Sequence, residues 1–102
     1  VDWTLGVDTI FNHIRGLSPF PTAWTEFRNK KNGEVVSLKI FETERIVKDH
    51  GKDVGLSTDN KTYLDVLVEG GVIRIKELQL SGKKRMKTEE FLRGFHIEDY
   101  SL

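Results

Sequence analysis

The feature that most constrains the fold is a period-two pattern of hydrophobicity in the middle of the chain. In residues 34–47, the apolar side chains Val36, Leu38 and Ile40 alternate with more polar neighbours. Successive side chains of a β-strand point to opposite faces, so such alternation is typical of a strand with one buried face. The sequence therefore predicts a long strand here.

Further strands are predicted on both sides of this segment. Residues 23–27 also alternate, and the turn-forming sequence NKKNGE separates them from the long strand. Residues 62–80 predict two strands joined at Gly70-Gly71, a dipeptide that tolerates the positive φ of a tight hairpin. The segment 48–61 is rich in Gly and Asp and is predicted to be a loop with a short strand near Val54–Ser57.

Two short helices are predicted near the ends of the chain. In residues 7–17, apolar side chains recur at helical spacing, with Pro19 and Pro21 after the last one; Pro-Phe-Pro should be extended. A second helix is expected over 88–93, with Thr88 as N-cap and Gly94 after its end. A helix, several short strands and a helix indicate an all-β fold, a small antiparallel β-barrel with a short helix at each end.

Composition limits what this chain can be. A length of 102 residues supports one domain, residues 1–102. The chain has no cysteine, which fits a reducing compartment, and we expect a cytoplasmic protein. It has no apolar run long enough to cross a bilayer, so no membrane partner is expected. Because it begins at Val1 rather than Met, we expect it to be a segment of a longer protein.

No motif in the sequence indicates an independent active site. The histidines His13, His50 and His96 are scattered, with no metal-ligand spacing, so we predict no metal site and ordinary surface or partly buried roles. The serines lack a G-x-S-x-G context, and the glycines form neither G-x-G-x-x-G nor a P-loop. We therefore expect no catalytic residue and no bound cofactor in this segment.

The charges are more informative, because a net charge of zero conceals unlike regions. The segment 74–87 holds six cations and one anion, Glu77, and residues 28–31 hold three cations. Such a segment is either a solvated surface or a contact for a phosphate backbone. Base stacking is not favoured, because the aromatic residues nearest to these segments are better placed in the core; they are Trp3, Trp24, Phe41 and Phe91.

Three stretches of the sequence resemble a known family. They are VDW at residues 1–3, IRGLSPFPTAW at 14–24 and LQLSGKKRMKTEEFLRG at 78–94. In this order and together they resemble the C-terminal domain of the methionyl-tRNA formyltransferase family, over essentially the whole chain. The chain departs from the family where it has DVGLSTDNKTY in place of a common PGT stretch, and where Phe20 replaces a Trp.

The resemblance implies an open, OB-like barrel that helps to bind initiator Met-tRNA. In that family a separate N-terminal domain binds 10-formyltetrahydrofolate and transfers its formyl group to the methionyl amino group. Neither the catalytic residues nor the folate site of that domain would lie in this chain. The expected partners are thus the tRNA and the N-terminal catalytic domain of the same protein.

The residues predicted to contact RNA come from the family's basic block, Lys83, Lys84 and Arg85, and from the charge pattern. Met86, which follows the family's basic block, is expected to pack inward. Arg15 also matches the family, but it could instead bind helix carbonyls or contact the other domain. The predicted nucleic-acid-binding residues are Lys83, Lys84, Arg85, Lys87, Lys30, Lys31 and Arg15.

Two alternatives remain open at this point. Other folate-dependent formyltransferases have a similar C-terminal barrel that serves a structural role without tRNA. A free-standing OB-like binding module is the other alternative. The adjacent cations Lys83, Lys84 and Arg85 favour the tRNA-binding version over a purely structural barrel.

Overall fold

The computed structural model describes residues 1–17 and 21–102. Ser18, Pro19 and Phe20 lie outside the described residues, and with them most of the Pro-Phe-Pro segment. The elements, in chain order, are α1 (Val7–Leu17), β1 (Ala23–Asn29), β2 (Val35–Val47), β3 (Gly55–Thr58), β4 (Leu64–Val68), β5 (Gly71–Leu80), β6 (Arg85–Lys87), α2 (Thr88–Gly94), the 3-10 turn η1 (Ile97–Asp99) and β7 (Tyr100–Ser101).

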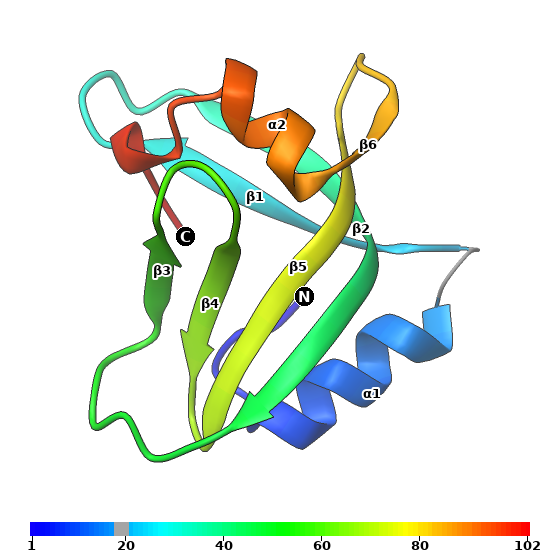
Figure 1. Cartoon of the computed structure of the whole chain (residues 1–102), viewed down its shortest axis with the longest axis vertical. Coiled ribbons are helices and arrows are strands. Elements are labelled where there is room, and N and C mark those ends of the chain that lie inside the picture. Colours follow the sequence, from blue (N-terminus) through cyan, green and yellow to red (C-terminus); the bar gives the residue numbers. More distant parts are fainter. Residues whose placement is uncertain (18–20) are drawn as a thin grey trace.

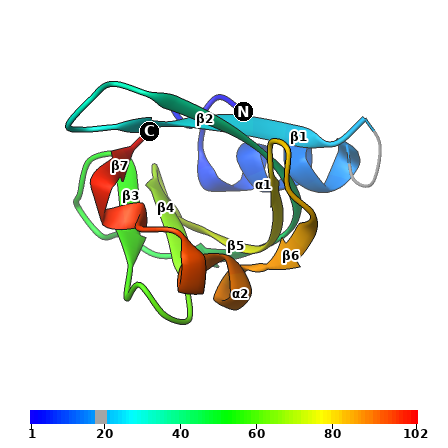
Figure 2. The ribbon, with the colours of Figure 1, turned by 90° about the horizontal axis from the view of Figure 1, so that it is seen from above.

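The strands form one curled antiparallel sheet. Its order is β3-β4-β5-β2-β1-β7, and β6 pairs with β5 outside that path. Figure 1 shows β5 and β2 crossing the molecule side by side, and Figure 2 shows the sheet curling into a nearly closed barrel. The predicted fold class, a small open antiparallel OB-like β-barrel with an N-terminal and a C-terminal short helix, is confirmed.

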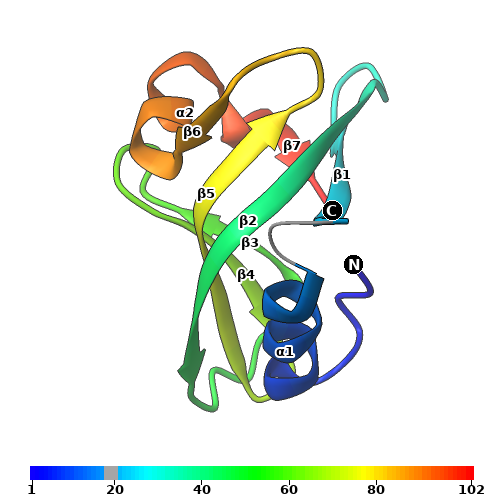
Figure 3. The same ribbon diagram turned by 90° about the vertical axis from the view of Figure 1, so that its right-hand side faces the viewer.

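Helix α1 packs its apolar stripe against the sheet. Its boundaries are those that the sequence predicts, and Val7, Ile10 and Ile14 are buried. Figure 3 shows the helix beside the lower half of β2. The core beneath it is built from the inward faces of β1, β2, β4 and β5, whose largest fully buried side chains include Phe27, Leu38, Ile40, Leu64 and Ile73. The predicted face of the long strand is thus confirmed.

The pairing of β2 and β5 is irregular where the sheet bends: Phe41 is the extra residue on β2 and Lys76 the extra residue on β5. The register between β2 and β5 shifts on both sides of Glu42. A bulge increases the local twist and changes which side chains point inward. The buried positions of β5 do not follow one alternation. Ile73 and Ile75 are buried two residues apart, but Leu78 is buried three residues after Ile75. Simple alternation along β5 did not predict this change of phase.

The hairpin between β4 and β5 differs from the prediction by one residue. Val68 pairs with Gly71, so the two turn residues are Glu69 and Gly70, and Gly71 already belongs to β5. Gly70 has the positive φ, +82°. Gly71 is required for another reason, because a Cβ there would lie 2.1 Å from the carbonyl oxygen of Ile46.

The other predicted element boundaries are close to the observed ones, but the predicted role of Thr88 is wrong. The short strand expected near Val54–Ser57 is β3, and α2 covers the predicted second helix. Thr88 is not the N-cap. Lys87 occupies that position without a side-chain cap, while the buried Thr88 hydroxyl donates to the carbonyl of Ile75 at 2.6 Å. This hydrogen bond attaches the start of α2 to the middle of β5.

Candidate nucleic-acid interface

The β5–β6 loop carries the cations that the sequence singled out. It is a tight turn, in which the Lys83 amide donates to the carbonyl of Leu80 at 2.9 Å. The Gln79 side chain also donates to the Lys83 carbonyl at 2.9 Å. Residues 81–85 are all exposed, and the loop projects from the upper end of the barrel in Figure 1. The backbone therefore holds Lys83, Lys84 and Arg85 on a firmly built projection.

The two cations within β5 form ion pairs with carboxylates from neighbouring strands. Arg74 donates to both carboxylate oxygens of Asp65 on β4, at 2.8 and 3.0 Å. This contact is the main cause of the raised pKa of Arg74. Lys76 lies 3.1 Å from Glu44 on β2. Neither cation is therefore available as an unpaired charge.

Glu77 forms ion pairs with two further cations, Arg85 and Lys87. The Arg85 Nε donates to the Glu77 carboxylate at 2.5 Å. The Lys87 ammonium nitrogen lies 3.2 Å from a Glu77 carboxylate oxygen and 3.7 Å from a Glu42 carboxylate oxygen. Hydrogen bonds from Arg85, and then from Lys87, lower the pKa of the Glu77 carboxyl. The pKa of Lys87 is raised, chiefly by its hydrogen bond to Glu77. Glu77 is mostly shielded from water, with 14% of its side chain exposed, so Arg85 is held more firmly than a typical surface cation.

The two remaining loop cations differ from each other. Lys84 lies 3.4 Å from Glu90 in an exposed pair. Exposed ion pairs are weak, because water and salt screen them. Lys83 forms no ion pair with any of the described residues. Of the cations in segment 74–87, Lys83 is thus the one most open to an external anion.

The second predicted cluster lies on the β1–β2 hairpin. The Lys30 ammonium donates to the backbone carbonyl of Glu98 at 3.1 Å, and Lys31 lies 3.9 Å from Asp99. Figures 1 and 3 place this hairpin at the same end of the barrel as the β5–β6 loop, but Figures 1 and 2 show the two separated across it. The structure therefore does not merge them into one patch.

Arg15 lies apart from both clusters, on α1. Its Nε donates to the side-chain oxygen of Asn12 at 2.7 Å, and its guanidinium lies 5.9 Å from the centre of the Phe11 ring. In the described residues its hydrogen bond is to this side chain and not to a helix carbonyl, so the structure does not support carbonyl capping. An external contact for Arg15 stays a prediction.

The expectation that all four aromatic residues are buried is wrong for Trp24. Trp3 and Phe91 are buried, and Phe41 is half-buried beneath the Arg85 guanidinium, which lies 4.0 Å from the ring centre. Trp24 is 54% exposed. The signal was present in the sequence, because Ala23, Thr25 and Phe27 form the inward set of β1 and place Trp24 on the other face.

The expected inward packing of Met86 is confirmed, since its side chain is partly buried against the core. The histidines are dispersed. The His50 Nε2 lies 2.7 Å from the carbonyl of Val68 and 3.1 Å from that of Gly71, so its role is to join β4 and β5. In the part of the chain that the structure describes, no cluster of three or more His, Cys, Asp or Glu side chains could ligate a metal. No described helix is long and apolar enough to span a membrane.

Comparison with known proteins identifies the family. The family model described as formyl transferase, C-terminal domain, matches residues 1–96. The chain is 47% identical over 100 residues to a methionyl-tRNA formyltransferase of Bacteroides thetaiotaomicron, covering 97% of this chain and 31% of the relative. It is 43% identical over 104 residues to one from Parabacteroides distasonis, covering all of this chain (100%) and 32% of the relative.

A more distant relative gives the same result. A methionyl-tRNA formyltransferase of Flavobacterium johnsoniae is 38% identical over 99 residues, covering 97% of this chain and 31% of the relative. The chain thus spans about a third of the length of these relatives. The resemblance that the three sequence stretches indicate is confirmed: this chain belongs to the family of formyl transferase C-terminal domains and is similar to those of methionyl-tRNA formyltransferases.

Proposed function

We propose that this domain binds initiator Met-tRNA on behalf of a full-length methionyl-tRNA formyltransferase. The β5–β6 loop contacts the phosphate backbone of the tRNA. An N-terminal domain of the same protein, with 10-formyltetrahydrofolate bound, transfers the formyl group to the methionyl amino group. The setting would be translation initiation in the cytoplasm. Similarity to named methionyl-tRNA formyltransferases and the exposed loop cations support the proposal.

One observation carries the proposal: Lys83 is exposed on a projecting loop and forms no ion pair within the described residues. Binding a phosphate there breaks no ion pair among the described residues. Lys84 follows it in the chain and can exchange its exposed partner Glu90 for phosphate at little cost, whereas Lys87 would also have to leave the shielded Glu77. Arg85 stays bound to Glu77 and supports the loop. Lys83 should therefore contribute most, followed by Lys84 and Lys87.

Contacts of this kind position the RNA without reading its sequence. The domain would supply affinity that depends on salt, and selection of the initiator tRNA would come from the N-terminal domain. Lys30 and Lys31 would add a second phosphate contact at the same end of the barrel.

The first test measures RNA binding by this chain as a function of salt. Replacing Lys83 by Ala should weaken binding of tRNA and of an unrelated duplex RNA alike. It should also reduce the slope of log K against log[salt] by roughly 0.7–0.9, the value for one phosphate contact. The matched control is Lys52→Ala, an exposed lysine in the loop at the opposite end of the barrel. An unchanged affinity and slope for Lys83→Ala would contradict the proposal.

The second test uses the full-length enzyme. Lys83→Ala combined with Lys84→Ala should raise KM for Met-tRNA more than it lowers kcat, because the loop acts in binding and not in the reacting centre. The free energy of unfolding should stay within about 0.5 kcal/mol of the wild type, as expected for exposed residues. A fall in kcat at constant KM would assign the loop to another role.

A second candidate function is supported by the ion pairs themselves. Arg74, Lys76 and Arg85 bind carboxylates within the domain, as expected if part of the basic segment only stabilises the barrel. Under this alternative the chain is the structural C-terminal barrel of another folate-dependent formyltransferase. Unchanged RNA binding in both tests would favour it.

A further inference from the structure

A row of side chains crosses the outer face of the sheet. The strand register places Trp24 on β1 opposite Lys39 on β2. Lys39 in turn lies opposite Gln79 on β5, and Gln79 opposite Arg85 on β6. Directly opposed residues of antiparallel strands project from the same face, with Cβ atoms about 4.5–5.5 Å apart. The face thus joins an indole ring to two cations and an amide.

Trp24 is the unusual member of this row. The residue is 54% exposed, although a tryptophan in a barrel this small would normally contribute to the core. Its neighbours in the row are polar, whereas an anchor for another protein normally lies among apolar side chains. Every nucleobase has a flat π-face that stacks on an aromatic ring, and stacking tolerates polar surroundings.

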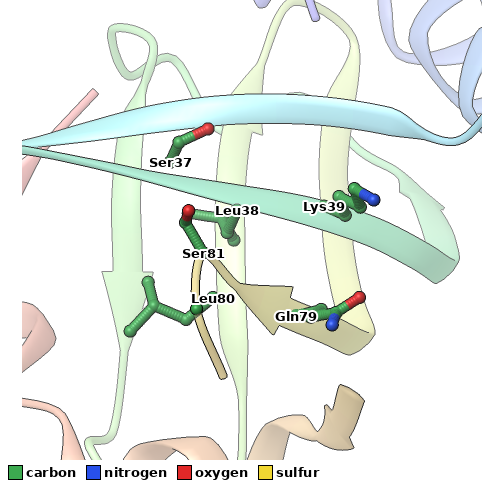
Figure 4. Close-up of a pocket in the computed structure, with 7 residues that line it drawn as sticks. Ser37, Leu38, Lys39, Gln79, Leu80 and Ser81 are labelled. Carbon is green, nitrogen blue, oxygen red and sulfur yellow. The ribbon is translucent and has the colours of Figure 1, made fainter. Parts of the chain in front are cut away.

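A small cleft lies beside the row, between β2 and the end of β5. Its volume is about 190 Å³. Figure 4 shows Ser37 and Ser81 close together at one end, and Lys39 with Gln79 at the other. Hydroxyl, ammonium and amide groups are the side-chain donors that proteins use for phosphate oxygens. Lys39 forms no ion pair with the residues that the structure describes, so its charge is available.

The carboxylates on this face decide where an anion would lie. Glu26 lies opposite Ser37 and is exposed, so it disfavours an anion at the serine end of the cleft. Glu77 is neutralised by Arg85 and Lys87. The Lys39 end, next to Trp24, is therefore the electrostatically favourable one.

We propose that this face binds one unpaired nucleotide of the RNA, with its base stacked on Trp24 and an adjoining phosphate at Lys39 and Gln79. The inference rests on the proposed RNA-binding function and goes beyond it. A backbone contact at Lys83 does not distinguish single strands from duplexes. A base can reach Trp24 only when it is not paired and stacked in a helix. The face should therefore give the domain a preference for RNA with an unpaired segment.

The test is a fluorescence titration of the 102-residue chain with an eight-nucleotide single-stranded RNA and with the blunt duplex of the same sequence. The chain has two tryptophans, and the buried Trp3 supplies a constant background. The single strand should quench the emission of Trp24, and the duplex should not. The affinities of the variants and for the duplex are measured by the anisotropy of dye-labelled RNA, because Trp24 variants lack the reporting indole. Trp24→Ala should weaken single-strand binding roughly 5- to 100-fold, the range for loss of one stacked base. Trp24→Phe, which keeps a ring, should retain most of the affinity.

Charge variants test the phosphate position. Lys39→Ala should weaken single-strand binding and reduce the salt slope by roughly 0.7, the value for one contact with a single strand. Glu26→Gln should strengthen binding, because it removes an anion from the same face. Lys52→Ala, at the opposite end of the barrel, is the control and should leave binding unchanged. All of these side chains are exposed, so the substitutions should not change the folding stability of the domain and thereby alter the measured affinity.

The outcomes separate this inference from the proposed function. If Lys83→Ala weakens both RNAs while Trp24→Ala changes neither, the stacking inference is overturned and the proposed function stands. If the wild-type chain binds neither RNA, both are overturned. Val1 lies next to Trp24, since its backbone nitrogen lies 2.8 Å from the Trp24 carbonyl oxygen. If the Trp24 emission of the full-length protein is shielded from iodide without RNA, the face contacts the rest of the protein and the inference is likewise overturned.

Discussion

The two ends of β5 contrast sharply. At its start, the backbone of Gly71 lies directly against that of Ile46, and the ring of His50 lies 3.1 Å from the Gly71 carbonyl oxygen. At its other end, the strand passes Leu80 and opens into an exposed loop, which is held by its turn hydrogen bonds and by the Ser81 amide donating to the carbonyl of Ser37 at 2.9 Å. The same strand thus begins in a closely packed position and ends in a loop exposed to solvent.

The cations of segment 74–87 follow the same gradient. Near the start of the strand, Arg74 is bound by two hydrogen bonds to a buried Asp65. In the loop, Lys84 has an exposed partner and Lys83 has none among the described residues. The contrast teaches that a basic stretch of sequence can be paired within the fold at one end and open to solvent at the other. Substitutions along β5 can test this gradient through stability alone.

The largest effect is expected at Gly71. Replacing it by Ala would place a Cβ 2.1 Å from the Ile46 carbonyl oxygen, and the strands would have to separate. We expect a loss of at least about 3 kcal/mol in the free energy of unfolding, measured by urea denaturation. Gly94→Ala is the matched control, because nothing lies within 4 Å of that Cβ, and it should be nearly neutral. A stable Gly71→Ala variant would mean that β2 and β5 are not held this closely.

A smaller effect is expected at Asp65. Its replacement by Ala removes two hydrogen bonds to the Arg74 guanidinium and leaves that cation partly buried without a partner. The expected loss is about 2–3 kcal/mol, as for hydrogen bonds to charged groups. Asp65→Asn preserves the shape and one acceptor and should lose less. Equal stabilities of the Ala variant and the wild type in urea melts would show that this end of the segment is not structural.

The smallest effect is expected at Glu77, where it should depend on pH. Because Arg85 and Lys87 lower the pKa of Glu77 in the folded state, its contribution is fully present above the pKa of the unfolded chain, about 4.3. It is lost as pH falls through the lower, folded value. Glu77→Gln should therefore cost no more than about 1 kcal/mol at pH 7 and progressively less toward pH 3. Thermal melts across this range would reveal it, and a difference that does not change with pH would contradict the ion-pair explanation.

Much of the fold was predictable because its signals are local. The stripe of α1 lies within one helical segment, and the alternation of β2 lies within one strand, so their periods identify them directly. The irregular pairing of β2 and β5 around Glu42 was not predictable, since it depends on how the two strands align. The role of Thr88 was missed for a similar reason, because its acceptor, the Ile75 carbonyl, belongs to another strand.

The candidate site was predictable only in outline. The sequence alone determined the family, the barrel and the position of the basic loop, because these depend on motifs and periods within short segments. Only the tertiary structure decided which charges are free, since the carboxylates that bind Arg74, Lys76 and Lys87 come from β4 and β2 through strand register. It also decided that Trp24 faces solvent beside Lys39. The physical reason is that charge and exposure are properties of neighbours in space, and strand pairing brings together residues that are far apart in the sequence.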